Sequence, residues 1–391
     1  MMDITNEGTV ENGSYTAETG AMTITNRGKL SSSTYTAKAG TMDITNEGTI
    51  ENGSHTAGGA MTITNHGKIS DGNYKARKAL RVYHAKDGTI SGGTFTGVDT
   101  TLINQADLSG AKVEGTKTLT VTNTASIQNA TLTGGAAAVD NHGEDSVMKD
   151  VTLTGSAITL TNEGTVENGS YTAETGAMTV KNSGTLSSGT YTAKAGTMGI
   201  TNRKTIENAA FTAGGALTYD GNADSTVTET TMTGAQVDIT NAGTLTNGSY
   251  TAETGAMTVK NSGKLSSGTY TAKAGMMDIT NQGTIENGTY TAGDALTYDG
   301  NADSTVTETT MTGASVDITN AGMLTNGSYT AEMGAMTVKN SGKLSSGTYT
   351  AKVGTMDITN QGTIENGEYT ARGNLTYTDT AEASLKDGTL I

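Results

Sequence analysis

The chain of 391 residues has no cysteine, proline or tryptophan, and it has only two phenylalanines. Without cysteine it can form neither a disulfide framework nor a thiolate metal site, and the redox compartment is left open. Hydrophobic residues make up 34% of the chain, which is little for the two or three globular domains that its length would suggest. These absences argue against a conventional globular core.

Positive charge is also scarce, because 24 basic residues face 39 acidic ones and leave a net charge of −15. Nucleic acid binding needs a basic stripe, so we expect no nucleic acid partner. No apolar run reaches the length of a membrane span, and the start "MMDITNEG" does not resemble a signal peptide.

What the chain does contain is a repeat. Met-x-Ile-Thr-Asn boxes begin at Met2, Met22, Met42 and Met61, at spacings of 20, 20 and 19 residues. The best-kept boxes, which begin at Ile158, Val237 and Val316, are 79 residues apart and mark a larger unit of four short repeats. A period of this length predicts a solenoid, in which each repeat buries its apolar face only against its neighbours.

The pattern inside one repeat identifies the kind of solenoid. In "MDITNEGTIENGSHTA" (42–57) apolar and polar residues alternate with period 2 in three short stretches, separated by Asn/Gly turns whose residues tolerate a left-handed backbone. β-Branched residues and glycines disfavour helix. We therefore predict an all-β parallel β-helix (β-solenoid) of about twenty three-sided coils of 19–20 residues. It forms one domain over 1–391, with regular coils at 1–79 and 158–391 and irregular coils at 80–157.

Two columns of equivalent residues should run through the stacked coils. We expect an inward aromatic column, in which Met232 and Met311 replace tyrosine, and a corner column of asparagines that bond the backbone of the next coil. The aromatic column comprises Tyr15, Tyr35, His55, Tyr74, Phe95, Tyr171, Tyr191, Phe211, Tyr250, Tyr270, Tyr290, Tyr329, Tyr349 and Tyr369. The asparagine column comprises Asn6, Asn26, Asn46, Asn65, Asn104, Asn123, Asn141, Asn162, Asn182, Asn202, Asn241, Asn261, Asn281, Asn320, Asn340 and Asn360.

The N-x-G-x-I boxes, such as the one at 46–50, cover nearly the whole chain. In these boxes the chain resembles the passenger regions of bacterial autotransporter adhesins and filamentous-haemagglutinin-like exoproteins. The resemblance implies a right-handed parallel β-helix that is secreted across the outer membrane and serves adhesion. The signal peptide, secretion domain and C-terminal barrel of such proteins are absent from this sequence, so we expect a fragment of a longer molecule.

Candidate chemistry is sparse. "YDGNADS" spaces oxygen ligands like the start of a calcium loop, but the later glycine and glutamate are missing, and we favour a variant turn. The residues concerned are Asp220, Asn222, Asp224, Asp299, Asn301 and Asp303. The four histidines are scattered, and no nucleophile, zinc or phosphate-loop motif occurs. We expect no enzyme activity and no cofactor, although a polysaccharide lyase is one alternative because lyases share this architecture.

One local basic cluster stands out in the acidic chain. It comprises Lys75, Arg77, Lys78, Arg81, His84 and Lys86. It is either a solvated face that offsets acidic neighbours or a binding spot for an anionic glycan, and we favour the first.

Outward columns suggest two further features. A threonine rank, with members such as Thr36, Thr192 and Thr271, resembles the flat arrays of ice-binding solenoids, although threonine is also simply a good exposed strand residue. Next to it Glu and Lys alternate between coils, as in Glu18 and Lys38, which predicts rungs of surface ion pairs.

The sequence thus favours a structural and adhesive cell-surface rod over an enzyme. We expect it outside the cell or on the bacterial surface. Its partner would be a receptor or glycan on a host or neighbouring cell, and it could also associate with itself. The alternatives are a polysaccharide-binding or polysaccharide-lyase β-helix and an ice-binding solenoid.

Overall fold

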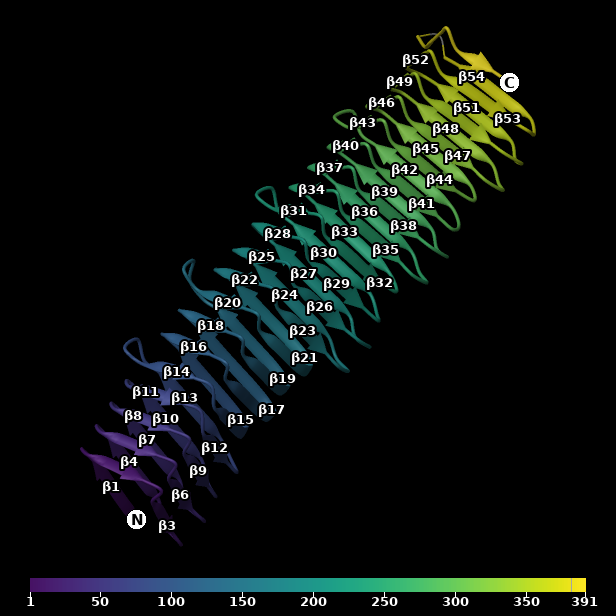
Figure 1. The fold of residues 1–391 in the computed structure, drawn as a ribbon. Helices are drawn as coiled ribbons and strands as arrows, with labels where there is room; N and C mark the ends of the chain where they lie inside the picture. Colours follow the sequence, from purple (N-terminus) through teal and green to yellow (C-terminus); the bar gives the residue numbers. More distant parts are fainter. Residues whose placement is uncertain (381) are drawn as a thin grey trace. The chain divides into compact units, whose positions relative to one another are not determined.

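The computed structural model describes residues 1–380 and 382–391. All regular elements in these residues are β-strands, and they build a parallel β-solenoid of about 19 turns, which confirms the predicted fold class. The chain divides into two compact units, 1–196 and 197–391, and each is a solenoid in its own right. Figure 1 shows how successive turns lay equivalent strands side by side within each unit.

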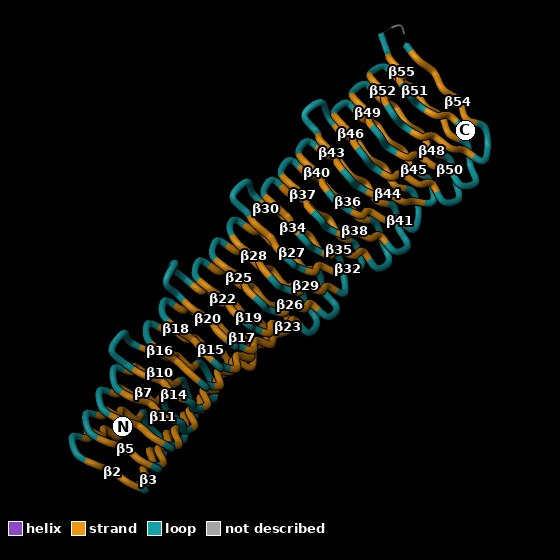
Figure 2. Tube along the Cα trace, turned by 45° about the horizontal axis from the view of Figure 1, so that its top comes forward, coloured by secondary structure: helices purple, strands orange, loops and turns teal. Residues whose placement is uncertain are grey.

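Each regular coil contains three short strands. In the first coil these are β1 (Met2–Asn6), β2 (Thr9–Glu11) and β3 (Ser14–Ala17), and turns separate them, as Figure 2 shows in teal between orange strands. β1 pairs in parallel with β4 (Met22–Asn26), so that Met2 lies beside Met22 and Asn6 beside Asn26. Every repeated residue therefore stacks on its own counterpart, and this stacking turns the sequence columns into ladders.

The core is built from these ladders. Met22, Ile24, Leu30 and Tyr35 are at most 1% exposed, and equivalent residues are buried in coil after coil. The aromatic column points inward as predicted, with neighbouring rings stacked 4.5–5.1 Å apart between centroids. Met232 occupies the same column beside Tyr250, which confirms that this is a packed interior position.

The asparagine column is buried and hydrogen-bonded along its length. Asn26 Nδ2 donates to Asn46 Oδ1 at 2.7 Å, to Gly28 O at 3.2 Å in its own coil and to Thr49 O at 3.0 Å in the next. Asn26 and Asn46 are fully buried. The amides therefore satisfy backbone carbonyls that bending at the first corner turns away from their strand partners, as the sequence predicted.

The corners use asparagine and glycine for different reasons. Asn52, at the second corner, has φ +53°, so the expected left-handed residue is the asparagine. Gly48, at the first corner, does not have a positive φ, and its role is to allow close approach: a Cβ there would lie 2.1 Å from Gly28 O. The prediction that corner glycines serve a left-handed backbone is therefore wrong at this position.

The third corner disappears in four coils, where the third strand runs without a break into the first strand of the next coil. These long strands are β15 (Thr94–Asn104), β17 (Lys112–Asn123), β19 (Thr131–Asn141) and β21 (Thr152–Asn162). Glycine replaces alanine at the end of the third-strand segment, as at Gly134, where a Cβ would lie 2.8 Å from Leu119 Cβ. The prediction of three strands per coil is confirmed, but these coils are not three-sided throughout.

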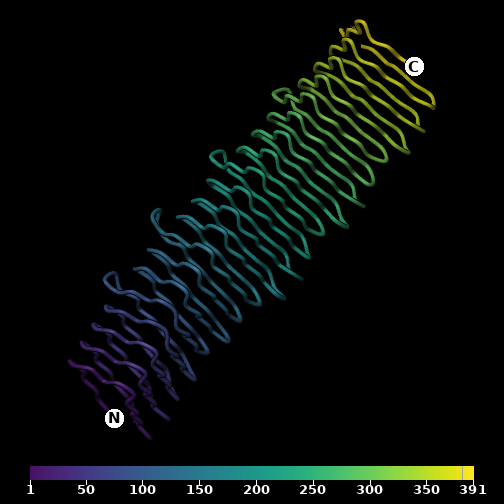
Figure 3. The backbone as a smooth tube through the Cα atoms, viewed as in Figure 1, coloured from purple at the N-terminus to yellow at the C-terminus, as the bar shows by residue number. Residues whose placement is uncertain are grey.

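The first corner is lengthened in several coils. It contains two residues in the first coil, between β1 and β2, but extends over 85–88, 142–146, 222–225 and 301–304 elsewhere. The longer loops project from the edge of the coils in Figure 3. They interrupt an otherwise uniform surface and are therefore the natural places to look for a site.

Candidate functional site

The basic cluster predicted from the sequence lies along a single coil of the first unit. Lys75 is on β12 (Asn73–Ala76), Arg81 is on β13 (Leu80–His84), and both side chains point outward and are exposed. Arg77 and Lys78 occupy the turn between these strands, and Lys86 lies in the projecting loop after β13. These five cations form what we call the basic strip.

None of the five strip residues forms an ion pair within the part of the chain that the structure describes. The reason lies in their neighbours, because Lys75 is flanked in register by Thr56 and Thr96, and Arg81 by Thr62 and Thr101. No acidic residue occurs between 72 and 86. The strip does not serve to offset acidic neighbours, which had been the favoured interpretation.

His84 does not belong to the strip, although the sequence grouped it there. Its side chain is 1% exposed and takes the place of asparagine in the corner column, between Asn65 and Asn104. Its Nε2 lies 3.1 Å from Asp107 O and its Nδ1 3.3 Å from Asn65 Nδ2. Burial lowers the pKa of His84, so it adds no positive charge at neutral pH.

Tyr83 is the member of this surface that sequence reasoning missed. It is 37% exposed on β13, two residues from Arg81 on the same outward face. The period-2 alternation of Leu80, Val82 and His84 was the signal that could have placed it outside. An exposed aromatic ring beside a cation can pack against the apolar face of a ligand.

A shallow recess adjoins the strip at the third corner. It is lined by Thr36, Ala37, Lys38, Thr56, Gly58 and Arg77. In this corner column Gly58 stands between Lys38 and Arg77, so the middle coil contributes no side chain beyond Cα. Lys38 pairs with Glu18 at 2.8 Å, whereas the Arg77 guanidinium faces the recess without a partner among the described residues.

The Glu–Lys rungs predicted for this corner are present. Lys194 pairs with Glu174 at 2.7 Å, and Lys352 pairs with Glu332 at 2.8 Å, in both cases across adjacent coils. The side chains are 42–55% exposed, so each pair is worth only ~0–1 kcal/mol. Paired rungs of this kind contrast with the unpaired strip.

The threonine rank is a double file in the second unit. On β32 (Thr231–Gly234) both outward positions are threonine, and in-register partners continue both files to β50 (Thr348–Ala351). The files are Thr231, Ser249, Thr269, Thr289, Thr310, Ser328 and Thr348, beside Thr233, Thr251, Thr271, Thr291, Thr312, Thr330 and Thr350. Thr233 and Thr312 escaped the sequence alignment because methionine precedes them in place of tyrosine. In the first unit Lys75 interrupts the corresponding rank.

The calcium-like segments form two of the lengthened first corners. Asp220 points outward from β30 (Leu217–Gly221), and Asn222 and Asp224 are exposed in the loop that follows. Ser225 closes this loop by donating from its N–H (3.1 Å) and its Oγ (2.7 Å) to Asn222 O. The same turn recurs at Asp299, Asn301 and Asp303, where Asn301 Oδ1 accepts from Asp303 N–H at 3.2 Å. Among the described residues no three His, Asp or Glu side chains gather as metal ligands.

The histidines do not form a catalytic arrangement with one another. His66 contacts Asp87 at 2.9 Å and His142 contacts Glu163 at 3.0 Å, in separate coils. His55 is fully buried between the rings of Tyr35 and Tyr74, and burial lowers its pKa to about 3. An imidazole sealed in the core cannot reach a substrate.

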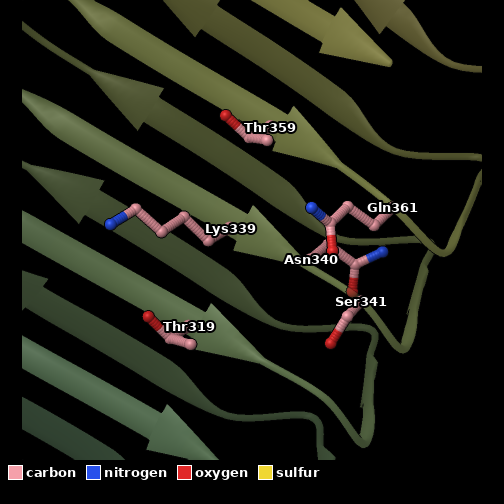
Figure 4. A pocket seen from close by; sticks show the side chains of 6 residues that line it. All are labelled: Thr319, Lys339, Asn340, Ser341, Thr359 and Gln361. Carbon is pink, nitrogen blue, oxygen red and sulfur yellow. The ribbon is translucent and has the colours of Figure 1, made fainter. Parts of the chain in front are cut away.

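A second shallow recess occurs twice in the second unit, 79 residues apart. Figure 4 shows the copy in which Thr319, Lys339 and Thr359 come from neighbouring parallel strands, with Gln361 and Ser341 just beyond the strand ends. The other copy centres on Lys260 and has the same residue types at each position. Each copy offers one isolated ammonium and several hydroxyls, which is a binding surface without a nucleophile–base pair.

No protein-family model matches the chain, and comparison with curated proteins finds no relative. The described residues include no helix of the length and apolar character that a membrane span requires.

Proposed function

We propose that the chain is a structural and adhesive part of a secreted cell-surface protein, of the kind that the resemblance to autotransporter and filamentous-haemagglutinin-like passengers suggested. The observation that supports this most is the repetition of outward residues in register. The double threonine file and the Glu–Lys rungs present the same groups at each successive coil.

Repetition of this kind favours adhesion for a physical reason. Strands stack about 4.8 Å apart, so equivalent groups recur at short, fixed intervals. A ligand with its own repeat, such as a polysaccharide or a second solenoid, can engage many weak contacts at once. Each contact after the first then forms at high effective concentration, which raises the overall affinity by orders of magnitude.

Adhesion is tested by coating beads with the full chain and measuring their attachment to each other and to bacterial or animal cells. We expect attachment to rise with coating density more steeply than linearly, because several contacts must act together. Sedimentation across a salt series separates self-association from receptor binding: the net charge of −15 opposes side-by-side contact, and salt relieves that repulsion. Beads that bind neither cells nor each other would refute the proposal.

The lyase alternative has a direct assay. An enzyme that cleaves acidic polysaccharides by elimination releases unsaturated products that absorb in the ultraviolet. We expect no such product from the full chain, and turnover at any substrate would overturn the adhesive proposal.

Ice binding is a second candidate, and the double threonine file is the observation that favours it. Its hydroxyls form a regular lattice, with about 4.8 Å between strands and about 6.7 Å between the two files. The test is thermal hysteresis and inhibition of ice recrystallisation, with Thr271→Lys and Thr291→Lys as the disrupting pair. Activity that this pair abolishes would support ice binding, and no activity at all would exclude it.

A further inference from the structure

We propose that the basic strip, together with Tyr83 and the Gly58 recess, is a binding site for an acidic polysaccharide that carries sulfate or carboxylate groups. This inference deepens the proposed adhesive function, on which it rests, by naming the chemical class of one partner. It concerns residues of the first unit only.

The strip is built differently from the other charged surfaces of the molecule. Elsewhere cations and anions stack on adjacent coils and neutralise one another, as Lys38 does with Glu18 and Lys194 with Glu174. Along the strip the in-register neighbours are threonines, so the positive charges keep their full field toward solvent. Charges that a protein leaves unpaired in one cluster are available to an anion from outside.

The shape fits a chain of sugars that crosses the solenoid coil. The cations follow one coil, from Lys75 on β12 through the turn at Arg77 and Lys78 to Arg81 on β13 and Lys86 in the loop. The recess over Gly58 has threonine side chains in its lining and the Arg77 guanidinium at one end. A guanidinium binds a sulfate or carboxylate through two parallel hydrogen bonds, while the threonine hydroxyls can bond sugar hydroxyls.

The same features disfavour nucleic acid as the ligand. Duplex DNA carries one charge per ~1.7 Å and needs a long basic track to offset it. The strip is confined to one coil of a chain whose net charge is −15, so a long, densely charged polymer would be repelled beyond it. A polysaccharide has fewer charges per length, and the exposed ring of Tyr83 offers a sugar an apolar face to pack on.

The experiment compares two double variants of the full chain. Lys75→Thr with Arg81→Thr removes two strip cations and installs the residue that both in-register neighbours have. Lys260→Thr with Lys339→Thr is the matched control, because these exposed lysines are also flanked by threonines and the net charge changes equally. Far-UV circular dichroism checks that each variant keeps its strands.

Binding to dextran sulfate, polygalacturonate, neutral dextran and duplex DNA is measured by calorimetry at 0.05 and 0.15 M salt. We expect the native chain to bind one or both acidic polysaccharides, and the strip variant to bind at least ~tenfold more weakly because two charge-assisted hydrogen bonds are lost. The control variant should bind within about twofold of the native chain, because its lysines lie outside the strip.

Three results would overturn the assignment: no binding to either acidic polymer, equal weakening in both variants, or DNA binding that is as tight and as dependent on the strip. The bead assay keeps this proposal separate from the adhesive one. Beads coated with the strip variant that lose polysaccharide binding but still attach to each other would leave adhesion standing. Native beads that bind acidic polysaccharide but attach to no cell and not to each other would remove the adhesive function and keep the site.

Discussion

Replacing two stacked asparagines tests whether the corner ladder holds the coils together. We consider Asn261→Ala, Asn281→Ala and the double variant, all within the second unit. Asn261 Nδ2 donates to Asn281 Oδ1 at 2.8 Å, to Gly263 O at 3.1 Å and to Thr284 O at 3.2 Å. Its Oδ1 accepts from Asn241 Nδ2 at 2.9 Å, and the side chain is 2% exposed.

The expected magnitude follows from this inventory. Removing the Asn261 amide deletes four contacts worth ~0.5–1.5 kcal/mol each and leaves buried polar groups without water, so a single variant should lose roughly 2–4 kcal/mol. The Asn261–Asn281 bond is shared and can be lost only once. The double variant should therefore fall short of the sum of the singles by about 1 kcal/mol.

Urea unfolding, followed by circular dichroism, gives the free energies for the double-mutant cycle. Lys260→Ala and Thr280→Ala are matched controls, because each exposed residue directly precedes a ladder asparagine in the same strand, and each should change stability by less than about 0.5 kcal/mol. Additive singles that each cost no more than these controls would refute a buried, hydrogen-bonded ladder.

Three further predictions concern single residues. Gly283→Ala should destabilise the second unit by more than ~2 kcal/mol, because its Cβ would lie 2.1 Å from the Gly263 carbonyl oxygen, whereas Gly199→Ala, with no atom closer than 3.7 Å, should be nearly neutral in the same urea assay. Because burial lowers the pKa of His55 to about 3, the unfolded chain takes up the proton first, so stability should fall as pH drops from about 6.5 toward 3. His55→Tyr should flatten this acid limb in unfolding curves recorded at pH 4 and 7, and an unchanged limb would contradict the argument. Glu308→Asn should raise the urea midpoint by about 0.5–1 kcal/mol, since Glu308 is exposed at φ +51°, a conformation that asparagine adopts more readily, and a lower midpoint would count against this explanation.

The sequence was sufficient for the fold because solenoid stacking places like residues on like. Once Met2, Met22 and Met42 are aligned, the register of the strands follows, and with it the burial of the aromatic and asparagine columns. Period-2 alternation then assigns inward and outward faces without knowledge of the three-dimensional path.

What the sequence could not supply was the local geometry of the corners. His84 looked like part of a basic cluster because neighbouring cations surround it in the sequence, but it continues the asparagine column in register with Asn65. The loss of the third corner in β15 to β21 likewise depends on how closely one backbone passes another. Glycine composition signals a tight turn or a close approach equally, and only coordinates separate the two.

The position of the basic strip also follows from how a solenoid divides its residues. Inward positions are fixed by stacking, because a change in one coil disturbs the coils on both sides of it. A ligand-specific feature can therefore arise only at outward positions and in lengthened corners, where a coil departs from its neighbours without breaking the ladders. The coil from Lys75 to Lys86 departs in both ways: it places cations where adjacent coils have threonine, and it carries a lengthened loop after β13. The recess over Gly58 adjoins the same coil. That concentration of departures in one coil is why we assign a specific partner to this surface and an avidity role to the regular ones.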